Sequence, residues 1–308
     1  MGGKLVIPFK KKILNHKNLY IANFTKNPNM GFLIFIHGGP GYNCGVVEYL
    51  IEHDNFFSLL DYNIILYDQR NCGRSKIYDE NTLHSNNVHD LDEIIEYFES
   101  VHEIEIKGLI GHSYGAKLLF DFYKKFDKKI PGIFVSTANS ILVPRLNNLK
   151  FDLAYLKKTS PTEYKKILQT MDVLTTSKLW ELTEELSPIF KENKDRNYLY
   201  WANMDMNEKV QKIQDTIGLP IDEKTFMSVR QDLYSSENNF SVDIDSLNIP
   251  YLWVNGFHDF IMNGQDFMFS KNEKILTFSR SSHYPHIEEN NKFCKVVNDF
   301  IQKQRAFV

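Results

Sequence analysis

The stretch IKGLIGHSYGAKLLFDFYKKF, residues 106–126, decides the fold expected for this chain of 308 residues. Ile106–Gly111 is an apolar run of strand length, and Ser113–Phe126 has the spacing of an amphipathic helix. The turn between them fits the pattern G-x-S-x-G. A serine at such a sharp turn adopts a strained backbone conformation, and glycines two residues away on either side avoid a collision. The turn leaves the hydroxyl above the sheet, so Ser113 is predicted to be a nucleophile.

Further strands and helices alternate on both sides of this stretch. Continuous apolar runs, typical of strands covered on both faces, are found at 31–37, 62–67, 130–136, 251–256 and 274–278. Helical spacing is found at 88–101, with Asn87 as the expected N-cap, and again at about 288–304, while 12–19 and 20–25 resemble weak strands joined by a turn. This alternation predicts an α/β fold with a mostly parallel sheet flanked by helices.

The strand pattern stops between about residues 140 and 235. Helical spacing with interspersed aromatic residues replaces it, and the strand signal returns at Tyr251. We therefore expect an α/β core formed by residues 1–139 and 236–308, interrupted by a helical cap at 140–235.

Two backbone amides are expected to stabilise an oxyanion beside Ser113. One is the N–H of Tyr114, directly after the nucleophile, at the start of a helix. The other is expected from the loop HGGPG at 37–41, which ends an earlier core strand and whose glycines allow close approach of the backbone. Gly39 is the predicted donor in this loop.

The acid and the base are expected in the order serine, acid, histidine. Asp259 follows the strand at 251–256 and is the predicted acid. The loop after the strand at 274–278 offers His283 and His286, and the position of His283 nearer to the strand end favours it as the base. His286, after a proline, is expected to pack or cap the last helix. His112 flanks the serine but is expected to point away from it, and His258 as base would leave Asp259 without a role.

Composition restricts the remaining classes. The chain has 36 Lys and Arg against 39 Asp and Glu, which gives no electrostatic case for nucleic-acid binding. Its three cysteines are too few for a disulfide framework, and no cluster has metal-ligand spacing, so neither a metal nor another cofactor is expected. The sequence shows no signal peptide and no apolar run of membrane-spanning length. We expect a cytoplasmic protein that acts on a small molecule or short peptide, without a membrane partner; the oligomeric state stays open.

Several blocks together resemble the prolyl iminopeptidase-type α/β-hydrolases. They are HGGPG at 37–41, DQRNCGRS at 68–75 and GHSYGA at 111–116, followed by IPYLWVNGFHD at 249–259 and SSHYPHIEE at 281–289. The resemblance covers residues 30–138 and 240–305. It implies the α/β-hydrolase fold, a Ser113–Asp259–His283 triad and release of an N-terminal residue, often proline, from small peptides.

Some features depart from the family pattern or allow other interpretations. Asn71 and Ala116 replace small residues of the pattern. The family binds the substrate's amine with acidic cap residues, and here Glu184, Glu185 and Asp205 are weak candidates; a solvated helix face is the favoured interpretation of Glu184, Glu185 and their neighbours. Asp68 and Arg70 are expected in buried ion pairs, and Lys117 is expected to face outward. An esterase or thioesterase acting on an acylated metabolite, or a non-catalytic ligand receptor with this fold, are the alternatives.

Overall fold

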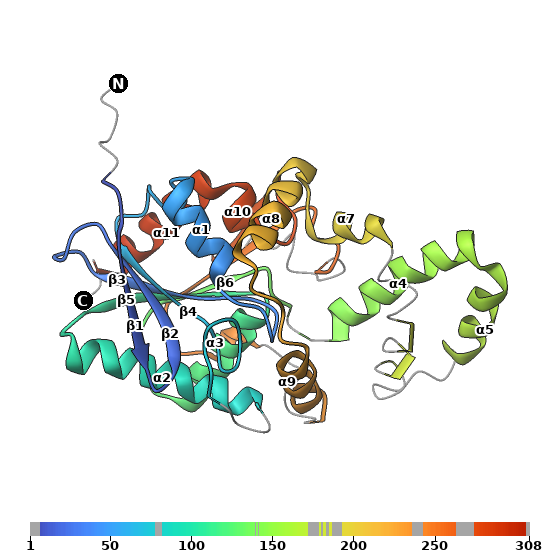
Figure 1. Ribbon diagram of the computed structural model, residues 1–308, viewed down its shortest axis with the longest axis horizontal. Helices are drawn as coiled ribbons and strands as arrows, with labels where there is room; N and C mark the ends of the chain where they lie inside the picture. Colours follow the sequence, from blue (N-terminus) through green and yellow to red (C-terminus); the bar gives the residue numbers. More distant parts are fainter. Residues whose placement is uncertain are drawn as a thin grey trace.

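A computed structural model describes residues 7–77, 82–138, 140, 142–171, 179, 181–182, 185–186, 193–235, 243–262 and 274–305. Its centre is a sheet with the strand order β1-β2-β4-β3-β5-β6-β7-β8 (Figure 1). The strands are β1 (Lys10–His16), β2 (Leu19–Thr25), β3 (Phe32–Ile36), β4 (Asn63–Tyr67), β5 (Ile106–His112), β6 (Gly132–Val135), β7 (Tyr251–Gly256) and β8 (Ile275–Phe278). The pairs from β4 to β8 are parallel, and β1 and β2 add an antiparallel hairpin.

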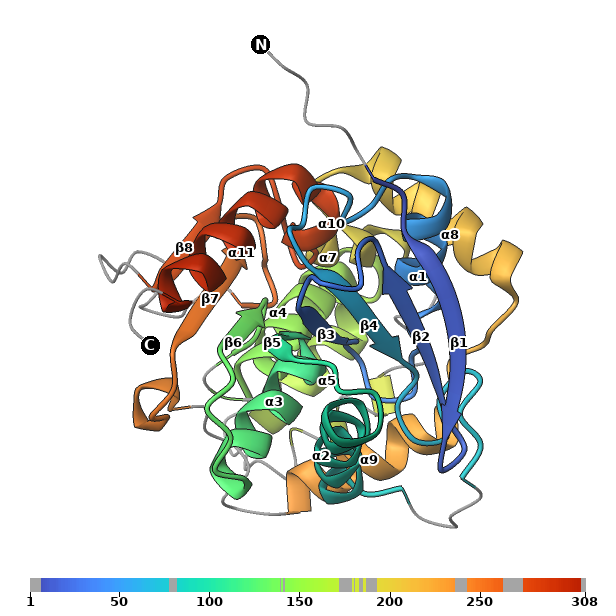
Figure 2. The same cartoon turned by 90° about the vertical axis from the view of Figure 1, so that its left-hand side faces the viewer.

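Helices cover both faces of this sheet. The described helices are α1 (Gly45–His53), α2 (His84–Val101), α3 (Tyr114–Lys125), α4 (Leu142–Thr159), α5 (Pro161–Met171), α7 (Asn197–Tyr200), α8 (Met204–Ile217), α9 (Glu223–Ser235), α10 (Pro285–Glu288) and α11 (Asn290–Arg305), with short 3-10 turns at Lys194–Arg196 and Ile244–Ser246. Figure 2 shows α2 and α3 on one face and α1 and α11 on the other. The predicted α/β architecture, a mostly parallel sheet flanked by helices, is confirmed.

The central strand β3 explains why the apolar runs are continuous. All five of its residues are buried. Ile34 packs in the core that contains Leu91 of α2 and Leu119 of α3. Phe35, the next residue, packs on the opposite face with Phe293 of α11. Successive strand residues point to opposite faces, so a sheet covered on both sides needs an apolar side chain at every position.

Between β6 and β7, which are neighbours in the sheet, the described elements are helical. Helices α4 and α5 extend away from the sheet and share a small core of their own (Figure 1). Two other helices of this segment instead join the main cores, α8 beside α1 and α9 beside α2. The boundaries of the cap at 140 and 235 stay a prediction.

The start of α2 differs from expectation. The helix begins at His84, so Asn87 is a buried residue of its first turn and not its N-cap. The reason is that other groups hold the helix start: within the first turn the side chain of Asn86 accepts a hydrogen bond from the N–H of Leu83, and from far along the chain Asp232 of α9 accepts one from the N–H of His84. The apolar spacing begins only at Val88, so it could not show this polar first turn.

Two further details of the helices were not anticipated. Helix α1 was not predicted at all, although five of its nine residues are buried. The prediction that Lys117 faces outward is wrong, because its side chain is only 4% exposed and forms an ion pair with Asp121 one turn later on α3.

Within the described ranges, none of the helices combines the length and apolar character that crossing a bilayer requires.

Candidate active site

The turn between β5 and α3 holds Ser113 in a strained conformation. Its φ is 53° and its ψ is −115°, a region that residues with a side chain rarely adopt. A Cβ on Gly111 would lie 2.5 Å from the carbonyl oxygen of Gly115, and one on Gly115 would lie 2.3 Å from that of Ile36. The turn is fixed to the sheet by the Ser113 N–H, which donates to the carbonyl of Val135 at 2.8 Å.

Three side chains from the ends of three parallel strands meet at this turn. His283 Nε2 lies 3.0 Å from the Oγ of Ser113, and His283 Nδ1 lies 2.9 Å from Oδ2 of Asp259. Ser113 follows β5, Asp259 follows β7 and His283 follows β8, so all three lie at the carboxyl edge of the sheet. The expected rival His286 does not take this place: its ring packs between Phe35 and Phe293.

Burial and hydrogen bonds orient the acid. The Asp259 side chain is fully buried, and that of His283 is 5% exposed. The other carboxylate oxygen of Asp259 accepts the N–H groups of Ile261 and Met262, each at 3.2 Å. With Nδ1–H of His283 donating to Asp259, Nε2 is free to accept the proton of the Ser113 hydroxyl. This is the arrangement that general-base catalysis by histidine requires.

The backbone of His283 is held by two neighbours. Its N–H donates to the carbonyl oxygen of Tyr200, the last residue of α7, at 3.0 Å. Its carbonyl oxygen lies 2.8 Å from Nε2 of His112, which is therefore the protonated nitrogen of that ring. The aromatic ring of Tyr200 also packs edge-on against the imidazole of His283, with ring centroids 5.6 Å apart. A helix of the segment between β6 and β7 thus contributes to the position of the base.

The HGGPG loop lies directly against the serine turn. A Cβ on Gly38 would be 3.0 Å from the Cβ of Ser113, and Gly39 has a φ of 56°. The buried amide of Gln69 holds this loop, donating to the carbonyl oxygen of His37 at 2.8 Å. In the part of the chain that the structure describes, the N–H groups of Gly39 and Tyr114 have no protein acceptor. Both N–H groups can therefore donate a hydrogen bond to an oxygen atom, and their role as an oxyanion hole stays a prediction.

The DQRNCGRS segment holds ion pairs beneath this loop. Asp68 is paired with Arg74, Nε to Oδ2 at 2.8 Å, and Arg70 is paired with Asp90 at 2.6 Å. Burial acts to raise the pKa of Asp68, but the hydrogen bonds and charge of Arg74 hold that pKa below its ordinary value. Asp68 also accepts the N–H of Cys44 at 2.9 Å. These pairs fix the segment that carries Gln69.

Two buried histidines, His112 and His286, lie in a row behind the base, with their rings tilted against one another. The ring of His112 lies 5.1 Å from that of His283 and 4.5 Å from that of His286, between centroids. Burial, and then the neighbouring imidazoles, lower the pKa of His112 well below its ordinary value. Burial and the nearby His283 lower the pKa of His286 to about 3.

Acid should therefore destabilise the fold through these two rings. The folded chain keeps them neutral, whereas the unfolded chain binds protons below about pH 6.5. As the pH falls from 6.5 to the pKa that the ring has in the folded chain, each ring lowers the free energy of unfolding by about 1.4 kcal/mol per pH unit. Urea unfolding of wild type and His286→Phe at pH 7 and pH 5 measures this effect. The variant should lose less stability on acidification, and equal losses in the two proteins would contradict the assignment.

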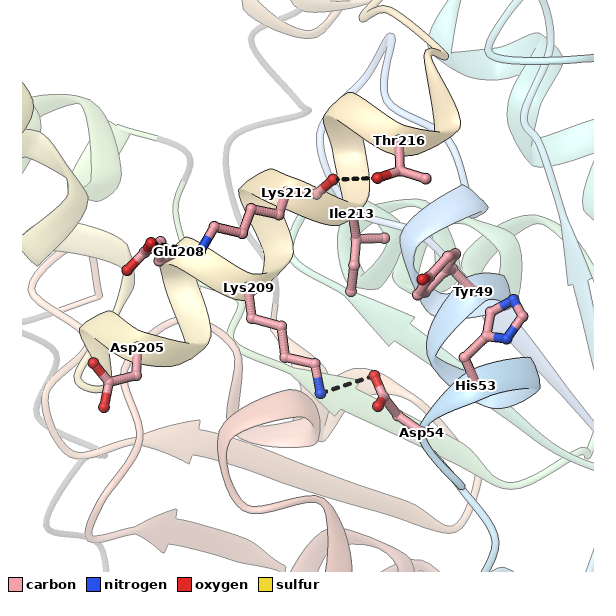
Figure 3. A pocket seen from close by; sticks show the side chains of 9 residues that line it. All are labelled: Tyr49, His53, Asp54, Asp205, Glu208, Lys209, Lys212, Ile213 and Thr216. Carbon is pink, nitrogen blue, oxygen red and sulfur yellow. Dashed lines mark hydrogen bonds and ion pairs between the residues drawn. The ribbon is translucent and has the colours of Figure 1, made fainter.

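The cap carboxylates named from the sequence are not seen at the three side chains. Glu184 lies outside the described residues, and Glu185 is exposed. Asp205 lines a groove of about 640 Å³ between α1 and α8 (Figure 3). This groove is bordered by ion pairs between Lys209 and Asp54 and between neighbouring residues of α8. None of Ser113, His283 and Asp259 lines it.

A different carboxylate of this segment acts electrostatically on Tyr200, whose ring contacts the base. Asp152 of α4 is buried and pairs with Arg196, Nε to Oδ1 at 3.2 Å. Burial is the main reason that the pKa of Tyr200 is raised to about 12, and the charges of both Asp152 and Asp259 add to this increase. Tyr200 thus lies within the electrostatic reach of both carboxylates. The only sequence signal for Asp152 was an acid within the apolar spacing of a helix, which is too common to single out.

Among the described residues no group of three or more His, Cys, Asp or Glu side chains could hold a metal ion. The protein groups that meet at the site are a hydroxyl, an imidazole, a carboxylate and two free amides. This set can form and stabilise an acyl intermediate on Ser113.

Comparisons with known proteins agree with this architecture. A sequence profile described as the alpha/beta hydrolase fold matches residues 31–290. The proline iminopeptidase of Saccharolobus solfataricus is 24% identical over 304 residues, covering 93% of this chain and 89% of its own. Among solved structures, a proline iminopeptidase-related protein from Thermus thermophilus superposes with a TM-score of 0.67 at 16% identity, covering 95% of this chain and 98% of its own. A thermophilic esterase superposes with a TM-score of 0.58 at 11% identity, covering 96% and 98%. The chain belongs to the alpha/beta hydrolase fold family.

Proposed function

We propose that this protein is a serine hydrolase that cleaves an amide bond through an acyl-enzyme, and that it acts as a proline iminopeptidase-like aminopeptidase on small peptides or amides. One observation carries the first part of the proposal. It is the line of hydrogen bonds from Ser113 Oγ to His283 Nε2 at 3.0 Å and from His283 Nδ1 to Asp259 at 2.9 Å.

The reaction follows from this line. His283 takes the hydroxyl proton as the Ser113 oxygen attacks the carbonyl carbon, and Asp259 stabilises the imidazolium that forms. The carbonyl oxygen becomes an oxyanion between the N–H groups of Gly39 and Tyr114. His283 then gives its proton to the departing amine, and the acyl group stays on Ser113. Water, activated by His283 in the same way, releases the acid and restores the serine.

The substrate class rests on the relative from Saccharolobus solfataricus, whose name is proline iminopeptidase and which aligns along most of the chain. An aminopeptidase must also bind the free amine of its substrate. Asp152 is the carboxylate we assign to this task, because it is buried in the segment between β6 and β7, pairs with Arg196 close before α7, and acts electrostatically on Tyr200, which contacts the base. Its partner Arg196 is 30% exposed, so the pair is open on one side.

Asp152→Asn should separate amine binding from hydrolysis. We expect KM for proline p-nitroanilide to rise about tenfold, since a charged hydrogen bond to the ammonium group is lost. Hydrolysis of p-nitrophenyl acetate, which has no amine, should change little. Asp205→Asn, an acid on the same segment that lines the distant groove, is the matched control and should leave both rates unchanged. Equal effects of Asp152→Asn on the two substrates would contradict the assignment.

The pH dependence tests the same carboxylate independently. Burial raises the pKa of Asp152 to about 6, against the opposing charge of Arg196. Below that pH the carboxyl group is protonated and neutral, and it no longer attracts an ammonium ion. The ratio of kcat/KM for the arylamide to kcat/KM for the ester should therefore fall as the pH drops below 6. A ratio that stays constant from pH 7 to pH 5 would show that this group does not bind the amine.

A second candidate is an esterase or thioesterase acting on an acylated metabolite. It is favoured by the position of Asp205, which lines the groove between α1 and α8 and not the turn that holds Ser113. A panel of proline arylamide, N-acetylproline arylamide and acyl esters distinguishes the two. A requirement for the free amine supports the peptidase, and turnover of esters alone supports this alternative.

A further inference from the structure

A second hydrogen-bonded line of side chains lies behind the serine turn. It begins at the phenol of Tyr114, the residue that follows Ser113. The Tyr114 hydroxyl lies 3.0 Å from Nδ1 of His84, and Nε2 of His84 lies 2.7 Å from a carboxylate oxygen of Asp121. The amide of Asn87 donates to the same phenol oxygen at 3.0 Å. All of these groups are buried or partly buried, so each bond is protected from water.

The donors and acceptors along this line form one consistent set. Asn87 donates to the phenol oxygen, the phenol donates to Nδ1 of His84, and Nε2–H donates to the carboxylate of Asp121. Burial acts to raise the pKa of Asp121, but the hydrogen bond from His84 and the charge of Lys117 hold that pKa below its ordinary value, so the carboxylate stays ionised.

His84 therefore connects two points of one helix. Tyr114 is the first residue of α3, and Asp121 lies seven residues later, two turns along the same helix. His84 belongs to α2, and its own N–H donates to Asp232 of α9 at 2.8 Å. A carboxylate at this place is favourable because the first N–H groups of a helix have no partner within it. The first turn of α3 is thus fastened to α2, and the start of α2 is in turn fastened to α9.

We propose that His84 is a positioning residue for the oxyanion donor, acting through the phenol of Tyr114. This inference deepens the proposed function and rests on it. The backbone N–H that is proposed to bind the oxyanion belongs to Tyr114, and the hydroxyl at the far end of the Tyr114 side chain is held by His84 and Asn87. The residue before it has a φ of 53°, so the turn keeps its shape only where the surroundings hold it. Once the phenol is released, the first turn of α3 can relax and the N–H no longer points at the oxyanion.

Tyr114→Phe removes the phenol oxygen and keeps the ring. Tyr123→Phe is the matched control, because Tyr123 lies on the same helix, is also buried and loses a single hydrogen bond, from its hydroxyl to the carbonyl of Ile130 at 2.8 Å. The assays are hydrolysis of p-nitrophenyl acetate, inhibition by an alkyl trifluoromethyl ketone and the thermal midpoint. The ketone forms a tetrahedral adduct whose oxyanion occupies the place between the two amides, whereas KM reports largely on the unreacted substrate.

For Tyr114→Phe we expect kcat to fall about tenfold, less than the loss from deleting a donor, with KM unchanged within about twofold. The trifluoromethyl ketone should bind more weakly by the same factor. Tyr123→Phe should leave kcat and ketone binding as in wild type, although the thermal midpoint falls in both variants. His84→Gln is a second route to the same result. The kcat of the double variant should be little lower than that of either single variant, because both substitutions break the same hydrogen bond between Tyr114 and His84.

The possible failures can be told apart. If wild type hydrolyses the arylamide and the ester and the two Tyr→Phe variants behave alike, or if Tyr114→Phe raises KM without lowering kcat, the positioning role is wrong while the proposed function stands. If wild type hydrolyses no ester or arylamide and the ketone does not bind, the proposed function fails and this inference fails with it.

Discussion

Ser113→Ala should lower kcat for ester and arylamide hydrolysis by at least about 10⁴-fold. Without the hydroxyl no acyl-enzyme forms, and His283 has no oxygen within hydrogen-bond distance to activate. Alanine is a small change here, because Ser113 sits at a turn whose shape depends on Gly111 and Gly115. Steady-state kinetics on the purified variant measure the loss.

The folded state of the Ser113→Ala protein is the necessary control. Its thermal midpoint should lie within a few degrees of that of wild type, because the serine side chain makes a single described hydrogen bond, to His283. A variant with substantial residual turnover and an intact fold would mean that another group is the nucleophile.

Asp259→Asn should have the second largest effect, a fall in kcat on the order of 10⁴-fold. An asparagine amide can donate to Nδ1 of His283, which then carries its proton on Nε2 and points that proton at Ser113. In this tautomer the imidazole cannot accept the hydroxyl proton. The backbone N–H groups of Ile261 and Met262, which donate hydrogen bonds to Asp259, can still donate to the one side-chain oxygen of the asparagine.

Asp54→Asn provides the matched comparison for this change. Asp54 pairs with Lys209 at the surface, and exposed pairs of this kind contribute little to stability. Its kcat should equal that of wild type. A mild effect of Asp259→Asn, close to that of Asp54→Asn, would exclude Asp259 as the acid and leave the histidine without the partner assigned to it.

The sheet could be predicted because its strands carry the information locally. Strands such as β3 and β7 are buried on both faces, so their apolar runs need no knowledge of distant residues. Parallel strands also end at one edge of the sheet. A serine, an aspartate and a histidine that each follow such a strand must therefore lie near one another, and the structure brings them within hydrogen-bond distance.

Other features depend on contacts that sequence spacing does not encode. Lys117 resembles a solvated helix residue until Asp121 and the neighbouring α2 are placed around it. The first turn of α2 is polar because its groups bond to Tyr114 and Asp232, on helices far away along the chain. Both cases are buried polar networks, which appear in a sequence as ordinary surface residues.

The helical segment between β6 and β7 depends most on contacts between distant residues. Its helices are amphipathic, and their spacing shows which face is apolar but not which element it covers. Asp152 and Asp205 both lie on such helices, yet one is buried near Tyr200 and the other lines a groove beside α1. Only the relative placement of α4, α7 and α8 separates them, and that placement is set by packing over long distances.

Labelling with a fluorophosphonate followed by peptide mass spectrometry shows whether Ser113 is an activated nucleophile. We expect one adduct per chain, located on Ser113, formed by the native protein and lost after unfolding in urea or in the His283→Ala variant. Such reactivity requires an activated hydroxyl beside an oxyanion site. A native protein that stays unlabelled, or that carries its adduct on another residue, would contradict the assignment of Ser113 as the nucleophile.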